Sequence, residues 1–237
     1  MKKLQLKDII AVRNLYNRED SEWALFNHAK NDIMVSNKPS TNETIIYFNT
    51  KDLDFLEKGF NKVDNNILNK LYSLPQKFDR RCELEYNDDI TKHPIPYVIV
   101  RNKDKYFFIL REKGSGEERL LGKKGMIGGH IGIEDKSDTL EQTIQNGFMR
   151  EVYEETHITQ DMINKCELKG IIKSYANETD IDHLGLIYEI EINTDNIKAE
   201  ENGVLSGMWI DKEDLYKHCD SFESWSRCVY NNILKFE

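Results

Sequence analysis

One predicted helix sets the strongest constraint on how this chain folds. A helix turns by about 100° per residue, so positions three or four apart share a face. In steps of four, four, three and four residues, one face carries Leu140, Ile144, Phe148, Glu151 and Glu155. This face begins apolar and ends acidic. The helix must therefore pack on a core, and its acidic end points at protein rather than simply at water.

The acidic end of this helix predicts a divalent metal ion. Glu151, Glu154 and Glu155 converge on one stripe. Like charges this close destabilise a helix and raise each other's pKa unless a cation lies among them. Mg²⁺ and Mn²⁺ take such oxygen ligands, commonly together with substrate phosphates. A solvated acidic surface is the alternative, and the apolar start of the stripe argues against it.

The segment Arg-Glu-Val-Tyr-Glu-Glu-Thr-His-Ile at 150–158 resembles the second half of a Nudix box. That family's pattern is Gly, five residues, Glu, seven residues, and then Arg-Glu-aliphatic-x-Glu-Glu-x-Gly-aliphatic. The segment Ile-Gly-Gly-His-Ile at 127–131 is similar to the first half. The stretches 97–131 and 222–226 also resemble a branch of predicted phosphoesterases in the Nudix group.

The spacing between the two halves departs from the pattern. Gly129 and Arg150 are separated by 20 residues, where the family has 13. We expect the seven additional residues to form a polar surface excursion between Gly129 and the helix. The Gly-Gly loop would then still lie beside Glu155.

Two residue identities depart from the pattern as well. The glycine near the end of the box is His157. The glutamate expected eight residues before Arg150 is Gln142. Glu134 and Glu141 are the candidates to replace it.

The resemblance implies the roles of the residues in the site. The metal ligands would be the carbonyl of Gly128 and the carboxylates of Glu151, Glu154 and Glu155. Glu151 would be a ligand or the general base, and the roles within the three glutamates are interchangeable. Arg150 would join Glu151 as a catalytic residue by orienting the glutamates. The implied cofactor is Mg²⁺ or Mn²⁺.

Candidate substrate-binding residues lie outside the helix. Gly129 allows a close approach of the backbone. Lys124 and Arg81 each belong to a basic pair that would contact phosphate, although a solvated pair is the plainer interpretation. Asp182 completes this set.

A further acid from a distal loop often completes the metal site of the family. The acidic link at 177–183 offers Glu178, Asp180 and Asp182 for this role, and a plain solvated loop is the alternative for each. His183, at the end of the link, is similarly ambiguous.

Composition excludes several classes of partner. A net charge of −9 disfavours binding of a nucleic-acid polymer, because that needs a basic footprint. No apolar run of about 18 residues and no signal peptide are found, so we expect no membrane contact and a cytoplasmic location. The cysteines are widely separated, which disfavours structural zinc and predicts free thiols. A homodimer stays open. The cysteines are Cys82, Cys166, Cys219 and Cys228.

The predicted fold class is α/β, a Nudix-type α/β/α sandwich with a mixed sheet. We expect it over 94–237, after an α/β extension at 1–93, with the boundary at Pro94 and Pro96. The extension would supply part of the pocket or a subunit contact. It begins with a helical pattern that includes Ile9, Leu15 and 23–26. Strands are predicted at 45–48, 97–100, 106–110, 167–174, 184–192 and 208–210, and helices at 65–74 and 222–236.

The activity implied by the resemblance is metal-dependent hydrolysis of a phosphoanhydride bond. The substrate would be a nucleoside diphosphate linked to another moiety, or a related small diphosphate. Two other classes of function stay open. Gln142 and His157 favour a Nudix-fold nucleotide sensor without turnover, and the fold also supports a prenyl diphosphate isomerase.

Overall fold

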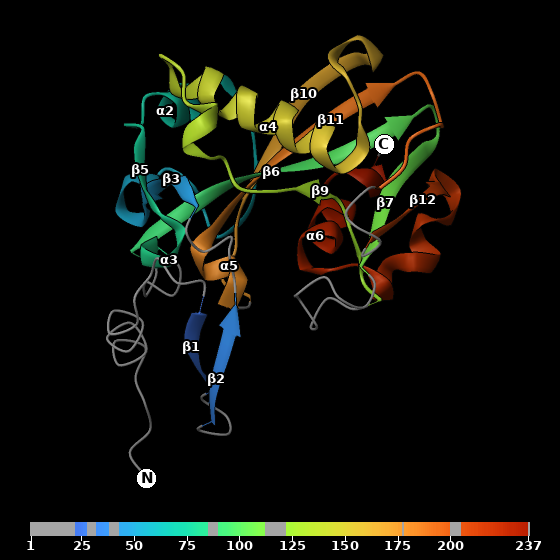
Figure 1. Ribbon diagram of the computed structural model, residues 1–237. Helices are drawn as coiled ribbons and strands as arrows, with labels where there is room; N and C mark the ends of the chain where they lie inside the picture. The colour runs from blue at the N-terminus through green and yellow to red at the C-terminus, as the bar shows by residue number, and fades with distance from the viewer. Residues whose placement is uncertain are drawn as a thin grey trace.

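The computed structural model describes residues 22–27, 32–37, 43–84, 90–111, 122–176, 178–199 and 205–236. A large twisted sheet forms the centre, with helices on both of its faces (Figure 1). Among these residues, no helix has both the length and the apolar character needed to cross a membrane.

The central sheet has the strand order β12-β7-β6-β11-β10-β4. Two of its strands, β6 and β11, run parallel at the centre, and the other pairs along this path are antiparallel. Two short strands, β8 and β9, pair with β7 and β6. The sheet is therefore mixed, as predicted. The bounds are β4 Gly59–Lys62, β6 Thr91–Asn102, β7 Lys105–Arg111, β8 Lys124–Gly125, β9 Ile127–Gly128, β10 Ile163–Lys173, β11 His183–Ile192 and β12 Leu205–Asp211.

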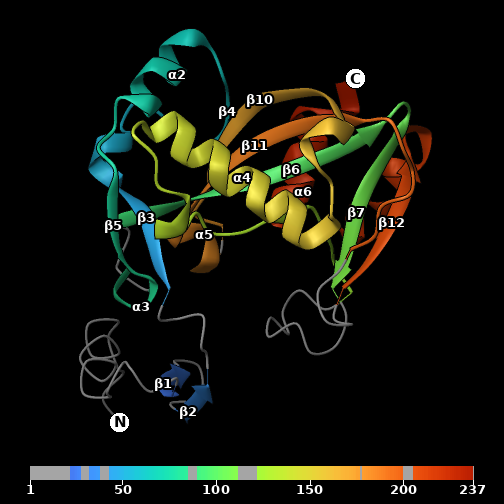
Figure 2. The ribbon, with the colours of Figure 1, turned by 45° about the horizontal axis from the view of Figure 1, so that its top comes forward.

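Helix α4 (Leu140–Thr156) covers one face of this sheet (Figure 2). Its buried residues Ile144 and Phe148 belong to the same hydrophobic cluster as Val98 and Val100 of β6. Alternate residues of a strand point to opposite faces. The predicted apolar stripe is thus confirmed, because Leu140, Ile144 and Phe148 are all buried.

Helix α6 (Ser224–Asn232) packs on the opposite face. Trp225 and Val229 form a second hydrophobic cluster with Tyr97 and Ile99, the residues of β6 that alternate with those facing α4. Two helical layers therefore enclose the sheet, and the predicted α/β/α sandwich is confirmed.

The extension is joined to the central sheet by backbone pairing. Strand β3 (Thr44–Asn49) pairs with β5 (Lys77–Arg80) and with the start of β6. Strand β4, also from the extension, lies at one edge of the sheet beside β10. Strand β6 runs across the boundary proposed at 93 and 94, and the division into two domains stays a prediction. The helix predicted at 65–74 is α2 (Asn65–Tyr72).

The helix expected to include 23–26 is a strand instead. Strand β1 (Glu22–Asn27) pairs antiparallel with β2 (Asp32–Asn37), while Ile9 and Leu15 lie outside the described residues. A short apolar run fits either state, and here strand pairing decides it. The other short elements are η2 Thr50–Leu53, α3 Arg81–Leu84, η4 Ile133–Asp135, η5 Gln160–Met162, α5 Glu178–Asp182, η6 Lys212–Ser221 and η7 Leu234–Phe236.

Candidate functional site

Helix α4 has well-defined ends that fix its acidic turn. Thr139 caps its start, because its hydroxyl accepts a hydrogen bond from the amide of Gln142 at 3.2 Å. His157 ends it in the left-handed region, at φ 57° and ψ 20°. Glycine adopts this conformation most easily, which explains why the Nudix pattern has glycine there.

Arg150 is the centre of the acidic turn. Its Nε and Nη2 donate to the two carboxylate oxygens of Asp135 at 3.0 and 2.8 Å, a bidentate pair. Its Nη1 donates to Glu151 at 2.8 Å and to Glu154 at 3.1 Å. Its Nη2 also donates to the backbone carbonyl of His130 at 2.8 Å. We call Arg150, Asp135, Glu151 and Glu154 the arginine cluster.

Asp135 is the acid that contacts Arg150 most closely. It is 4% exposed and lies directly on the guanidinium. Glu134 is 61% exposed and approaches Arg150 only to 4.0 Å. Glu141 is exposed in the first turn of α4. Asp135 therefore joins Glu134 and Glu141 as a candidate to replace the box glutamate, and the choice among them stays a prediction.

The position of Asp135 also bears on where the seven additional residues lie between Gly129 and Arg150. Five residues separate Gly129 from Asp135, as in the family's pattern, so with Asp135 as the acid of the box the additional residues lie between Asp135 and Arg150. Most of that stretch is the start of α4, which begins at Leu140. Residues 133–139, which precede the helix, are mostly exposed, and the expected surface excursion between Gly129 and the helix stays a prediction. The Gly-Gly loop still meets the helix at Glu151.

The carboxylate of Glu151 lies against the backbone of Gly129. A Cβ added at Gly129 would lie 2.1 Å from Glu151 Oε2, so only glycine permits this contact. Burial raises the pKa of Glu151 to about 7, and the hydrogen bond from Arg150 offsets only part of the effect. The site thus holds a carboxyl group poised to exchange a proton near neutral pH.

The other two glutamates differ in exposure. Glu154 is 56% exposed and binds Arg150 from the solvent side. Glu155 is half-buried, on the same face of α4 as Glu151. A Cβ at Gly128 would lie 2.6 Å from the carbonyl oxygen of Pro96, so this loop packs closely on β6. Carboxylates of this kind beside a glycine backbone suit a hard divalent cation, so the residues present fit Mg²⁺ or Mn²⁺.

The predicted substrate-binding residues do not all gather at this turn. Gly129 adjoins Glu151, as described above. The ammonium group of Lys124 donates to Ser221 Oγ in η6 at 2.8 Å. Arg81 lies 3.4 Å from Glu43 of the extension.

The acidic link predicted at 177–183 is mostly the short helix α5. Asp180 and Asp182 are both buried, at 3% and 4% exposure. Ser174 Oγ donates to Asp180 Oδ2 at 2.6 Å. Two of the three candidates for the distal acid are thus internal groups and not a solvated loop. The side chain of Glu178 lies outside the described residues.

Three histidines form a second group that the sequence analysis did not recognise as a unit. His93, His130 and His183 offer ring nitrogens that all lie within 4.8 Å of one another. We call them the histidine cluster. His130 belongs to both groups, because Arg150 binds its carbonyl while its ring faces His183. The sequence offered one signal for this cluster. His130 directly follows the two glycines of the box, and His183 was already noted at the end of the acidic link.

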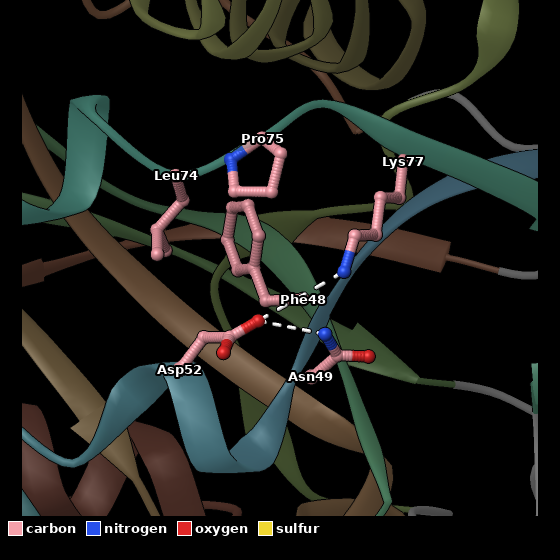
Figure 3. Close-up of a pocket in the computed structure, with 6 residues that line it drawn as sticks. All are labelled: Phe48, Asn49, Asp52, Leu74, Pro75 and Lys77. Carbon is pink, nitrogen blue, oxygen red and sulfur yellow. Dashed lines mark hydrogen bonds and ion pairs between the residues drawn. The ribbon is translucent and has the colours of Figure 1, made fainter.

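A small surface pocket lies between β3, η2 and the start of β5 (Figure 3). Its polar groups bind one another: Asn49 Nδ2 donates to Asp52 at 2.7 Å, and the ammonium of Lys77 lies 3.9 Å from the same carboxylate. It contains no predicted site residue. The pocket is lined by Phe48, Asn49, Asp52, Leu74, Pro75 and Lys77.

Comparison with known proteins agrees with the fold. No family model matches the chain. Protein YmaB of Bacillus subtilis is 26% identical over 157 residues, which cover 63% of this chain and 74% of YmaB. The crystal structure of Tm1382, described as "a putative Nudix hydrolase", matches with a TM-score of 0.68 and 26% identity. That match covers 82% of this chain and all of Tm1382.

The chain has the Nudix fold, and the predicted resemblance to Nudix hydrolases is confirmed. The match to Tm1382 spans most of the chain, so it supports a hydrolase class for the protein as a whole.

Proposed function

We propose that this protein hydrolyses a phosphoanhydride bond in a nucleoside diphosphate linked to another moiety, or in a related small diphosphate, with the help of a divalent metal ion. The observation that carries the proposal is the position of Glu151. Its carboxylate is held by Arg150 at 2.8 Å and lies against Gly129, where an added Cβ would displace it. A carboxylate fixed beside the half-buried Gly-Gly loop can take part in chemistry on a bound phosphate.

Mg²⁺ or Mn²⁺ would be held by the carbonyl of Gly128 and the carboxylates of Glu151, Glu154 and Glu155. Such an ion neutralises charge on phosphate oxygens and lowers the pKa of a bound water. Glu154 is the least constrained of these groups, because it is exposed and already binds Arg150. We therefore expect Glu151 and Glu155 to contribute most.

As the alternative to binding the metal ion, Glu151 would act as the general base. Burial raises its pKa to about 7, and a base acts best when its pKa is near the working pH. Arg150 acts through Glu151 in this proposal: it fixes the rotamer of the carboxylate and touches no substrate itself. The bidentate pair with Asp135 fixes Arg150 in turn.

The substrate phosphates would lie along the Gly-Gly loop, with Gly129 allowing the close approach. Arg81 lies near the histidine cluster: burial is the main cause of the lowered pKa of His93 and His130, and the charge of Arg81 adds to it. Lys124 would have to release Ser221 to reach a ligand. Asp182 would act from the buried end of α5. Of these four residues, Gly129 has the strongest geometric support.

A hydrolysis screen with and without Mg²⁺ tests the proposal. Wild-type protein and the variant Glu155→Gln are assayed side by side on nucleotide sugars, dinucleotides and nucleoside triphosphates. Glu155→Gln keeps the size of the side chain but removes a charge that a metal ligand carries. We expect activity to fall by at least about 100-fold, as for loss of one group that stabilises developing charge.

Glu141→Gln is the matched control. It makes the same change on an exposed residue in the first turn of the same helix, and it should keep wild-type activity. Equal rates for Glu155→Gln and wild type would remove Glu155 from the site. Metal-dependent nucleotide binding without turnover in the wild type would favour the sensor function instead.

A further inference from the structure

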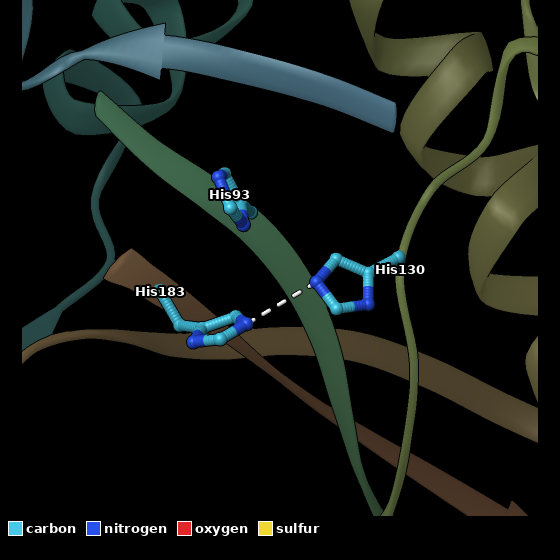
Figure 4. Close-up of side chains that lie close together, drawn as sticks. All are labelled: His93, His130 and His183. Carbon is cyan, nitrogen blue, oxygen red and sulfur yellow. Dashed lines mark hydrogen bonds between the residues drawn. The ribbon is translucent and has the colours of Figure 1, made fainter. Parts of the chain in front are cut away.

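The histidine cluster brings together three segments that are far apart in the sequence. His93 lies in β6, His130 follows β9, and His183 is the first residue of β11. Figure 4 shows the three rings turned towards a common centre. The Nε2 atoms of His183 and His130 are 3.2 Å apart.

The fold holds these rings in place from two directions. In the parallel pair of β6 and β11, His93 lies directly opposite His183, so their side chains leave the sheet on the same side. The loop that carries His130 is fixed because Arg150 binds its carbonyl and Glu151 packs on Gly129. The cluster is therefore a product of the tertiary structure and not of a flexible surface.

The protein encloses the three rings, and imidazole binds metals through its neutral form. His93 and His183 are buried and His130 is half-buried. The backbone of Leu84 lies near the ring of His93, but among the described residues neither ring nitrogen of His93 makes a hydrogen bond of good geometry. Buried polar atoms normally have such a partner, so His93 has the capacity to bind a ligand.

The ring geometry also differs from simple stacking. The centroids are 5.2 to 5.6 Å apart and the ring planes are inclined by 52° to 83°. Two nitrogens bound to a tetrahedral zinc ion at about 2.0–2.1 Å are about 3.3 Å apart. The pair His130 and His183 already has that separation. The ligand atom of His93 lies within 4.8 Å of the other two, so a short approach brings all three to one ion.

We propose that His93, His130 and His183 together bind one transition-metal ion of the zinc class, at a site separate from the arginine cluster. Three imidazoles select zinc, copper, nickel or cobalt over Mg²⁺, which prefers oxygen ligands. Three protein ligands leave a fourth position for water or another oxygen donor. The ion joins the Gly-Gly loop to the two central strands, and so fixes the backbone beside Glu151.

Binding of Zn²⁺ and Co²⁺ to the full-length protein tests this site. The metal-free protein is titrated with Zn²⁺ against a chromophoric chelator in excess Mg²⁺, which occupies the carboxylates. We expect one zinc per chain and a higher melting temperature. With Co²⁺ we expect visible absorption bands typical of tetrahedral coordination.

The variants His93→Gln and His183→Gln should each weaken zinc binding by more than the roughly 100-fold known for loss of an outer-shell contact. His218→Gln, in η6, is the matched control and should bind as wild type does. Glu155→Gln should also keep the zinc. Zinc binding by Glu155→Gln distinguishes this site from the proposed hydrolytic site. A variant that loses hydrolysis but keeps zinc shows that the two proposals can be tested separately.

Two results would overturn the site. One is a wild-type protein that takes up less than one zinc per chain under these conditions. The other is zinc binding that survives in both histidine variants and disappears in Glu155→Gln. Zinc uptake is measured on wild-type protein and on variants whose folding is confirmed by circular dichroism. A variant that unfolds is therefore left out of the comparison.

Discussion

The arginine cluster and the histidine cluster meet at His130, whose carbonyl binds Arg150 and whose ring faces His183. Both clusters gather polar side chains inside the protein, but they differ in charge. The arginine cluster gathers three carboxylates and contains its own permanent cation, Arg150. The histidine cluster has no permanent charge of its own, and burial lowers the pKa of His93 and His130. Clustered carboxylates need a counter-charge, whereas buried neutral rings need only partners for their polar atoms. The two clusters should therefore respond differently to every change of charge.

The largest effect should follow from removing the built-in cation. Arg150→Ala leaves Asp135 buried with an unpaired charge, and breaking a buried ion pair from one side typically costs about 3–5 kcal/mol. We expect a loss of that size in the free energy of unfolding, measured with urea. Arg227→Ala is the control, because Arg227 is exposed and donates only to a carbonyl. Equal losses in the two variants would show that Arg150 does not hold the cluster together.

The next effect is a dependence of stability on pH in the presence of a chelator. Glu151 has a pKa of about 7 in the folded protein, against an ordinary value of 4.5, so the folded state binds the proton more tightly. Its contribution is therefore favourable at low pH and is lost as pH rises from about 4.5 to 7. The shift corresponds to at most about 3 kcal/mol.

Comparison with Glu151→Gln isolates this effect. The buried histidines act in the opposite direction, since their lowered pKa costs stability as pH falls, but they are common to both proteins and cancel. Urea unfolding at several pH values should show that the advantage of wild type over Glu151→Gln declines with rising pH. A constant difference between the two proteins would contradict the assigned pKa.

A smaller effect of opposite sign is expected in the histidine cluster. Without metal, His93→Leu replaces a ring with two unbonded buried nitrogens by an apolar side chain. Such a change is neutral or stabilising by about 1 kcal/mol. Thermal melting in chelator measures it. A large destabilisation would show that the neutral cluster, like the charged one, is held together by interactions within the protein.

An effect of about the same size is expected at His157, the residue that ends α4. His157 has φ 57°, which costs a residue with a Cβ about 1–2 kcal/mol, whereas glycine adopts it freely. We expect His157→Gly to stabilise the protein by about 1 kcal/mol, after the loss of the ring contact with Tyr153. Thermal melting of His157→Ala, which keeps the Cβ, is the control and should show no such gain.

The sequence predicted the parts of the site that lie on one element. The spacing of Ile144, Phe148, Glu151 and Glu155 is visible because a helix imposes its period on the chain. Asp135 was missed because the acid of the box was sought eight residues before Arg150. The additional residues of this chain lie in that interval, so the count ends at Gln142. Counting forward from Gly129 identifies it.

The histidine cluster was not predictable in the same way. His93 and His183 meet only through the register of two parallel strands, and His130 reaches them through a loop. No local spacing encodes such an arrangement. The strands at 97–100 and 106–110, by contrast, were predicted correctly, because their pairing is local.

The short strand β4 has a consequence for how the protein behaves in a crowded solution. It covers the end of β10 at Gly170–Lys173, and without it this end would present open backbone groups to a neighbouring molecule. The rest of the edge carries Lys165 and Lys169, whose charges discourage pairing with another sheet. We therefore expect a shortened chain that begins at 94, which lacks β4, to aggregate even where its remaining core is correctly folded.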